Sequence, residues 1–185
     1  SPAGGGASWL APSSGAVATT PLLELTRAGW QFENIQFAPH TASAAVRLTR
    51  SASTDTIDAS YARFKACRFA ANGGSGQIGI EDNGGCSRVL IEESWFEQLT
   101  GTAIKGISTS AAIPLLWRIS RNRFDGNTNA IGMSLTQGLV DHNFIRQTAN
   151  DTNFKVNLVA LSGQGSLNQV LRNFFPDAVG NVTIA

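Results

Sequence analysis

Short stretches of alternating apolar and polar residues run along the whole chain, and one of them recurs. An apolar residue, four residues of mixed character and a phenylalanine occur together six times, at intervals of about 28 residues. A further residue two positions upstream, such as Trp30 or Val89, extends the alternation, which is typical of a short strand. The six copies end at Phe37, Phe69, Phe96, Phe124, Phe144 and Phe175.

A second alternating pair often follows each phenylalanine, as in Val46/Leu48 and Ile78/Ile80. The segments between the strands are rich in Gly, Asn, Ser and Thr, which is the composition of turns. Nowhere does a helical period persist for ten residues or more with capping residues. The pattern therefore predicts short strands joined by corners, with almost no α-helix.

Repeated strands and corners in a constant order are typical of a solenoid, in which stacked repeats bury a continuous core. These strings of apolar-x-apolar-x-x-Asn-x-Phe type resemble the right-handed parallel β-helix family, the pectate-lyase-like fold, over residues 22–185. The resemblance implies an all-β, right-handed parallel β-helix of about six coils. It implies little about function, because members include polysaccharide lyases, glycosidases, epimerases and non-enzymatic phage virion proteins.

Stacked coils would place equivalent side chains in rows about 4.8 Å apart. The six repeat phenylalanines are predicted to form one inward core stack. In the family a corner position often holds an inward asparagine, and Asn122 and Asn173 match it, whereas Cys67, Ser94 and His142 depart from it.

Two outward rows are also predicted. One is a charge ladder of Glu93, Arg121, Asp141 and Arg172, which alternates in sign. The other places Trp95 between Arg68 and Arg123, a cation–π arrangement that could also serve as a surface ligand ladder. We expect both rows to be mainly structural.

Composition limits the classes of partner. The chain has 185 residues, a net charge of +1 and only 15% charged residues, so neither nucleic acid nor an anionic membrane is the expected main partner. Apolar runs are too short to span a bilayer. No signal peptide is expected, and Ser rather than Met at position 1 predicts a processed, trimmed or partial product. The two cysteines, Cys67 and Cys86, are expected to be free and buried.

Residues 1–20 contain no charge and are rich in Gly, Ala, Ser and Pro. They are predicted to form an extended or flexible N-terminal arm, with Trp9 and Leu10 as anchors that dock on a neighbour. Residues 21–185 are predicted to form a single β-helix domain.

Candidate chemistry is sparse. Calcium would need converging carboxylates, but the predicted stacking places Arg121 between Glu93 and Asp141. The best remaining acidic patch is Glu81–Asp82 beside Glu92–Glu93, which we do not expect to be a metal site. A glycosidase pair of Glu92 or Glu93 with Glu97 or Asp125 stays open. His142 is expected to be a structural, inward imidazole. No catalytic residue, metal or cofactor is therefore assigned.

These observations favour a non-enzymatic virion protein of a bacteriophage, either a capsid decoration protein or a small spike. It would assemble laterally, as a homotrimer, and contact other capsid or tail proteins. The alternative is a carbohydrate-active depolymerase or a fragment of one. A third hypothesis is a secreted or cell-surface solenoid that binds polysaccharide through Arg68, Trp95 and Arg123.

Overall fold

The computed structural model describes the strands of three parallel sheets. It describes residues 8–10, 20–39, 43–51, 57–106, 114–146, 156–159, 167–176 and 183–184, and for residues 8–10, 156–159 and 183–184 the backbone alone. The described residues contain no helix, and every pair of named strands is parallel. The prediction of an all-β chain of parallel strands is confirmed. No helix in the described part has the length and hydropathy needed to cross a membrane.

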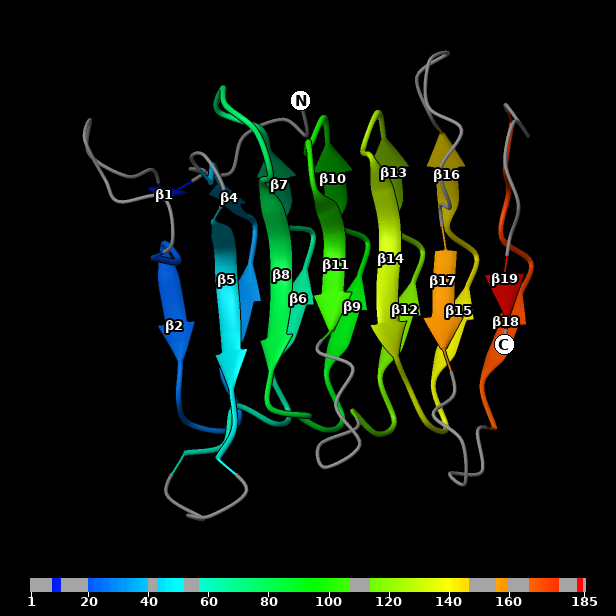
Figure 1. Cartoon of the computed structure of the whole chain (residues 1–185), viewed down its shortest axis with the longest axis horizontal. Helices are drawn as coiled ribbons and strands as arrows, with labels where there is room; N and C mark the ends of the chain where they lie inside the picture. The colour runs from blue at the N-terminus through cyan, green and yellow to red at the C-terminus, as the bar shows by residue number, and fades with distance from the viewer. Residues whose placement is uncertain are drawn as a thin grey trace.

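The chain visits the three sheets in a fixed order, and each strand lies beside its equivalent from the next repeat (Figure 1). Sheet A contains β1 (Ser8–Leu10), β4 (Ile35–Phe37), β7 (Arg68–Ala70), β10 (Trp95–Glu97), β13 (Arg123–Asp125) and β16 (Phe144–Arg146). Sheet B contains β2 (Leu23–Leu25), β5 (Ala44–Thr49), β8 (Ile78–Asn83), β11 (Thr102–Gly106), β14 (Asn129–Ser134), β17 (Val156–Val159) and β19 (Thr183–Ile184). Sheet C contains β3 (Gln31–Glu33), β6 (Arg63–Lys65), β9 (Leu90–Glu92), β12 (Arg118–Ser120), β15 (Leu139–Asp141) and β18 (Gln169–Leu171).

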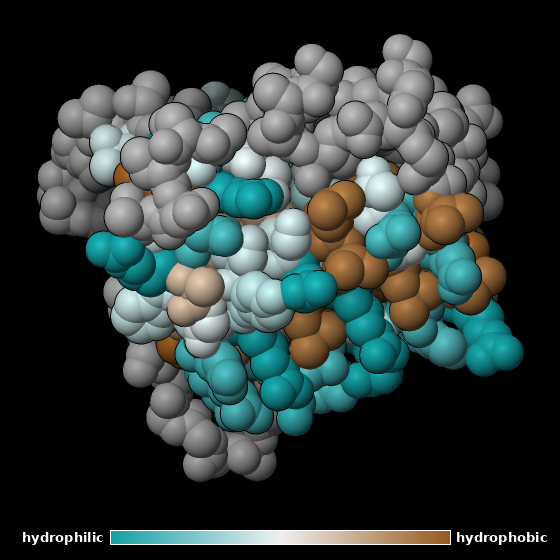
Figure 2. Space-filling model, turned by 90° about the horizontal axis from the view of Figure 1, so that it is seen from below, coloured by the Kyte–Doolittle hydropathy of each residue, from teal (hydrophilic) through white to brown (hydrophobic). Residues whose placement is uncertain are grey.

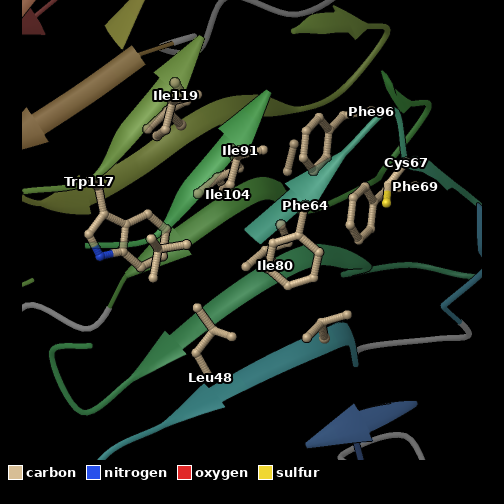
Figure 3. Packing of buried hydrophobic residues seen from close by; sticks show 14 of the residues in the cluster. Leu48, Phe64, Cys67, Phe69, Ile80, Ile91, Phe96, Ile104, Trp117 and Ile119 are labelled. Carbon is tan, nitrogen blue, oxygen red and sulfur yellow. The ribbon is translucent and has the colours of Figure 1, made fainter. Parts of the chain in front are cut away.

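The core lies between the sheets and is built from in-register rows. Phe37, Phe69, Phe96 and Phe124 stack with ring centroids 4.9, 4.7 and 4.9 Å apart. Figure 3 shows Phe69 and Phe96 packed face to face from neighbouring strands. Parallel pairing brings equivalent side chains together at every repeat, and the recurring phenylalanine therefore becomes a continuous buried column.

The fifth repeat is placed one residue later than the sequence predicts. Ile145, not Phe144, pairs with Phe124, whereas Phe144 pairs with the outward Arg123. Phe144 is therefore not in the core stack. Phe175 is partly buried and packs against the core. The residue before it, Phe174, forms an isolated parallel bridge with Phe144.

Hydrogen bonding of an asparagine accounts for the shifted register. The Asn143 amide donates to the Ile119 carbonyl at 2.9 Å, and its Oδ1 accepts from the Asn122 backbone N–H at 2.8 Å. Asn143, rather than His142, therefore continues the inward ladder. In this register His142 lies at the exposed corner, and Asp141 lies in β15 beside Ser120.

Tight corners separate sheet C from sheet A. Glu93, Arg121, His142 and Arg172 each occupy this corner with φ between 53° and 54°, in the left-handed region. Few non-glycine residues adopt such angles, and here consecutive repeats do so at the same position. The corner aims each side chain outward and fixes the rows on both flanking strands.

Part of the predicted N-terminal arm belongs to a sheet. Ser8–Leu10 forms β1, which pairs in parallel with β4 and places Trp9 opposite Gln36 and Leu10 opposite Phe37. The segment that carries both expected anchors therefore extends sheet A of its own chain. The side chains of Trp9 and Leu10, and the rest of residues 1–19, lie outside the description.

Candidate functional site

The outer face of sheet A carries the row that the sequence singled out. Trp95 pairs with Arg68 on one side and with Arg123 on the other. The guanidinium carbons lie 5.2 and 5.0 Å from the centre of the indole ring. Arg123 also lies 5.4 Å from the ring of Phe144, which extends the row by one aromatic residue.

The side chains of this row already have partners within the chain. A guanidinium covers each face of the Trp95 indole. Arg68 is held by Glu97, with nitrogen–oxygen distances of 3.0 and 2.5 Å, and Arg123 is held by Asp125 at 2.8 Å. A sugar ring could stack on Trp95 only after one of these ion pairs opened, so the geometry favours a structural role for the three residues.

One polar atom in the row has no partner. Trp95 Nε1 is the single buried side-chain nitrogen or oxygen without a hydrogen bond among the described residues. Leaving an indole N–H unpaired costs free energy of about 1–3 kcal/mol. The cation–π contacts on both faces of the ring offset part of that cost.

The acids considered for catalysis are distributed over separate ion pairs. Glu92 on sheet C binds Arg63 and Arg121, whereas Glu97 and Asp125 on sheet A bind Arg68 and Arg123. Arg121 also lies 3.3 Å from Glu93. The structure therefore gathers Glu92 and Glu93 around Arg121 and does not pair either of them with Glu97.

The predicted charge ladder is changed by the register of the fifth repeat. Its corner row contains Glu93, Arg121, His142 and Arg172, while Asp141 lies one residue earlier, in β15. The alternation in sign therefore ends at Arg121. The physical reason is the amide ladder of Asn122, Asn143 and Asn173, which fixes the position of the corner.

A hydroxyl, a carboxylate and an imidazole do meet on sheet C. Asp141 accepts a hydrogen bond from the Ser120 hydroxyl and lies 2.9 Å from Nδ1 of His142. Burial alone would raise the pKa of Asp141, but the bonds to Ser120 and His142 and the charge of Arg118 outweigh it and lower that pKa. The carboxylate separates the hydroxyl from the imidazole, so His142 cannot act as the base for Ser120 in this arrangement.

Asp82 is the one described carboxyl whose pKa is raised. Its side chain is 0% exposed and faces the core from β8. Burial raises the pKa to about 6, against the opposing effect of hydrogen bonds from the backbone N–H groups of Cys86 and Gly85 at 2.9 and 3.1 Å. Asp82 therefore closes the turn after β8 and is not accessible to a substrate.

Both cysteines are free and buried. Burial raises the pKa of the Cys86 thiol, and the neighbouring Asp82 adds to this effect. Burial also raises the pKa of Cys67. Thiols held in this state are poor nucleophiles. Within the described part of the chain, no three His, Cys, Asp or Glu side chains gather as they would around a metal ion.

Sequence reasoning missed further amide side chains at the other corners. The Asn127 amide donates to the Phe96 carbonyl at 2.9 Å and accepts from the Leu99 N–H at 3.0 Å. The amide of Asn168 bonds the Leu135 carbonyl and accepts from the Gly138 N–H. The signal for Asn127 was its place three residues after a repeat phenylalanine, the same spacing that marks Asn122 after Ile119.

Comparisons with protein-family models, with curated proteins and with solved structures found no match.

Proposed function

We propose that the three sheets form one right-handed parallel β-helix of about six coils. The fixed succession of sheets B, C and A supports this, since each passage adds one strand to every sheet. The stacked phenylalanine and asparagine rows support it too, because they require equivalent residues to recur at one strand spacing. Right-handedness follows the general preference of parallel crossovers and the family resemblance.

We further propose a non-enzymatic structural role, and one observation carries it. Each of the ten acids whose side chain is described has a cation or a hydrogen-bond donor as partner. Glycoside hydrolysis needs an accessible carboxylic acid with a raised pKa. The raised pKa belongs to Asp82, which faces the core.

The setting we propose is a bacteriophage virion, as a capsid decoration protein or a small spike that assembles laterally as a homotrimer. The family that the repeats resemble includes non-enzymatic phage virion proteins, so this setting is compatible with the fold. Exposed large apolar residues support association, and they include Trp30, Tyr61, Leu115 and Leu116. A surface with few charges offers little electrostatic resistance to such contacts.

Three measurements test the proposal. Mass spectrometry of purified phage particles should find the chain at a stoichiometry fixed by the lattice or tail. Light scattering should give the mass of a trimer. Incubation with polygalacturonate or capsular polysaccharide should release no new reducing or unsaturated ends. Release of such ends, lost when Glu97 or Asp125 is changed to its amide, would instead favour the depolymerase alternative.

A further inference from the structure

The corner between sheets B and C carries a row of exposed side chains. Tyr61, Arg88 and Leu116 each precede a strand of sheet C by two residues and have φ angles of 63°, 56° and 59°, in the left-handed region. Backbone hydrogen bonds of 2.7 to 3.0 Å join each of these corners to the following repeat. The three residues therefore lie in a row, with about 4.8 Å between neighbours.

Apolar side chains surround the arginine of this row. Tyr61 is 52% exposed, Leu116 is 42% exposed, and the preceding residue, Leu115, is 39% exposed. Figure 2 shows apolar residues gathered on the face seen from below, the side on which sheet B leads into sheet C in Figure 1. We call Tyr61, Arg88, Leu115 and Leu116 the B–C corner surface. Its residues precede β6, β9 and β12, which all have a sheet C strand on both sides.

An aromatic ring holds the Arg88 side chain in place. The guanidinium carbon of Arg88 lies 5.2 Å from the centre of the Tyr61 ring, and its Nη1 donates a hydrogen bond to the Tyr61 hydroxyl. Contacts of this kind restrict the conformations of a long side chain before a ligand arrives. Less conformational entropy is then lost when the guanidinium binds that ligand.

Arg88 differs from the other stacked arginines because it lacks a carboxylate. Arg68 and Arg123 also lie over an aromatic ring, and each is held by a carboxylate, at 2.5 and 2.8 Å. Among the described residues, no Asp or Glu forms an ion pair with Arg88, whose side-chain partner is Tyr61. A guanidinium can bind a carboxylate through two parallel hydrogen bonds. Arg88 is therefore oriented for a carboxylate from another molecule.

We propose that the B–C corner surface binds an acidic, apolar segment of a partner protein. A carboxylate of that segment binds Arg88, and apolar side chains beside the carboxylate pack on Leu115 and Leu116. The inference rests on the proposed structural role, in which the chain attaches to other proteins of an assembly, and it names the surface and the chemistry of one such contact.

The composition of the B–C corner surface favours a polypeptide over other anionic ligands. Anionic lipid surfaces are recognised by clusters of about four to eight Lys or Arg, and nucleic acids by several phosphate contacts. This surface has one arginine, and the charges of the nearby Arg63 and Arg118 already act on Glu92 and Asp141. A polysaccharide would find no hydrogen-bonding group on the two leucine side chains. Tyr and Arg beside apolar residues are typical of the centres of protein–protein interfaces.

A short peptide tests the surface directly. The probe is acetyl-Ser-Leu-Glu-Leu-Ser-amide, titrated into the full isotope-labelled chain and followed by nuclear magnetic resonance. We expect saturable shifts of the Arg88 Nε–H and of the backbone amides of Tyr61, Arg88 and Leu116, with a Kd of about 1 mM or below. Two matched peptides separate the contributions, Ser-Leu-Gln-Leu-Ser without the charge and Ser-Ser-Glu-Ser-Ser without the apolar side chains. Each should bind at least about fivefold more weakly.

Variants of the chain locate the contacts. Arg88→Gln should weaken binding of the acidic peptide at least about tenfold. Arg121→Gln is the matched control, because Arg121 also lies exposed at a left-handed corner but is held by Glu92 and Glu93, and binding should change less than about twofold. Leu116→Ser should weaken binding, and Arg88→Glu should bind Ser-Leu-Lys-Leu-Ser in place of the acidic peptide. Circular dichroism checks that each variant remains folded.

The proposal is overturned if the acidic peptide causes no saturable shift up to about 5 mM, if the glutamine peptide binds equally well, or if Arg88→Gln binds like the natural chain. It is also overturned if vesicles of phosphatidylcholine and phosphatidylserine bind the chain while the peptide does not, which would make this a membrane-binding surface. The titration is independent of particle analysis. Peptide binding by a chain that particles lack would remove the virion setting alone, whereas a chain found in particles that does not bind the peptide would remove this surface alone.

Discussion

Replacing Asp82 by asparagine should remove the part of the pH dependence of the free energy of unfolding that the Asp82 carboxyl contributes. The Asp82 carboxyl is 0% exposed, and burial raises its pKa from 3.8 to about 6. The folded protein therefore keeps a proton that the unfolded chain has already released between pH 4 and pH 6. In that window the contribution of Asp82 to stability falls as the pH rises, and above pH 6 the full cost of the buried charge is present.

The size of the effect follows from the two pKa values. A change from 3.8 to about 6 corresponds to about 3 kcal/mol. Asparagine has no such titration, but it replaces the oxygen that accepts from the Gly85 N–H, at a cost of about 1–3 kcal/mol at every pH. The free energy of unfolding of the natural chain minus that of Asp82→Asn should therefore fall by about 2.4 kcal/mol between pH 4 and pH 7, because the rest of the change lies below pH 4 and above pH 7.

Urea unfolding followed by tryptophan fluorescence at constant ionic strength measures this difference. All other carboxyls are common to both proteins, so their titration cancels. Asn122→Ala serves as the control, because it removes a buried side chain that does not titrate, and its effect should be the same at each pH. A difference for Asp82→Asn that stays constant, or that grows with pH, would refute the reasoning.

Three further predictions concern the stacked rows. Phe96→Ala should lower the free energy of unfolding by about 3–5 kcal/mol, because it interrupts the buried phenylalanine column, and unchanged urea melting would contradict the column. Asn143→Ala should cost about 2–3 kcal/mol and His142→Ala less than about 1, and the reverse order would contradict the register of the fifth repeat. Gly79→Ala should cost about 1–3 kcal/mol, because its Cβ would lie 2.6 Å from a backbone oxygen, whereas Gly132→Ala, with 3.3 Å to its nearest neighbour, should cost less in the same assay.

The repeat pattern was enough to predict parallel strands and four members of the phenylalanine column, because a buried position recurs whenever a repeat recurs. It failed at Phe144 because two spacings fit equally well, Leu139 to Phe144 and Val140 to Ile145. Hydrogen bonds to Asn143 decide between them, and these depend on the neighbouring repeats. A one-residue shift then exchanges the inward and outward faces of the strand.

The sequence predicted where the residues of the candidate site lie, but not their ion pairs, their burial or their pKa values. The spacing placed Trp95 between Arg68 and Arg123, yet the saturation of that row depends on the distances to Glu97 and Asp125. The raised pKa of Asp82 depends on burial within an inward row, which no local motif marks. Strand β1 was missed because three residues in a segment rich in Gly, Ala and Pro carry no periodic signal.

Because the chain passes through the three sheets in a fixed order, the number of repeats sets the number of strands in each sheet. Every strand pairs only with its equivalents in the preceding and following repeats. Duplicating one repeat of about 28 residues would lengthen all three sheets by one strand, about 4.8 Å, and leave the cross-section as it is. The length of such a chain could therefore change in evolution by whole repeats, in equal steps.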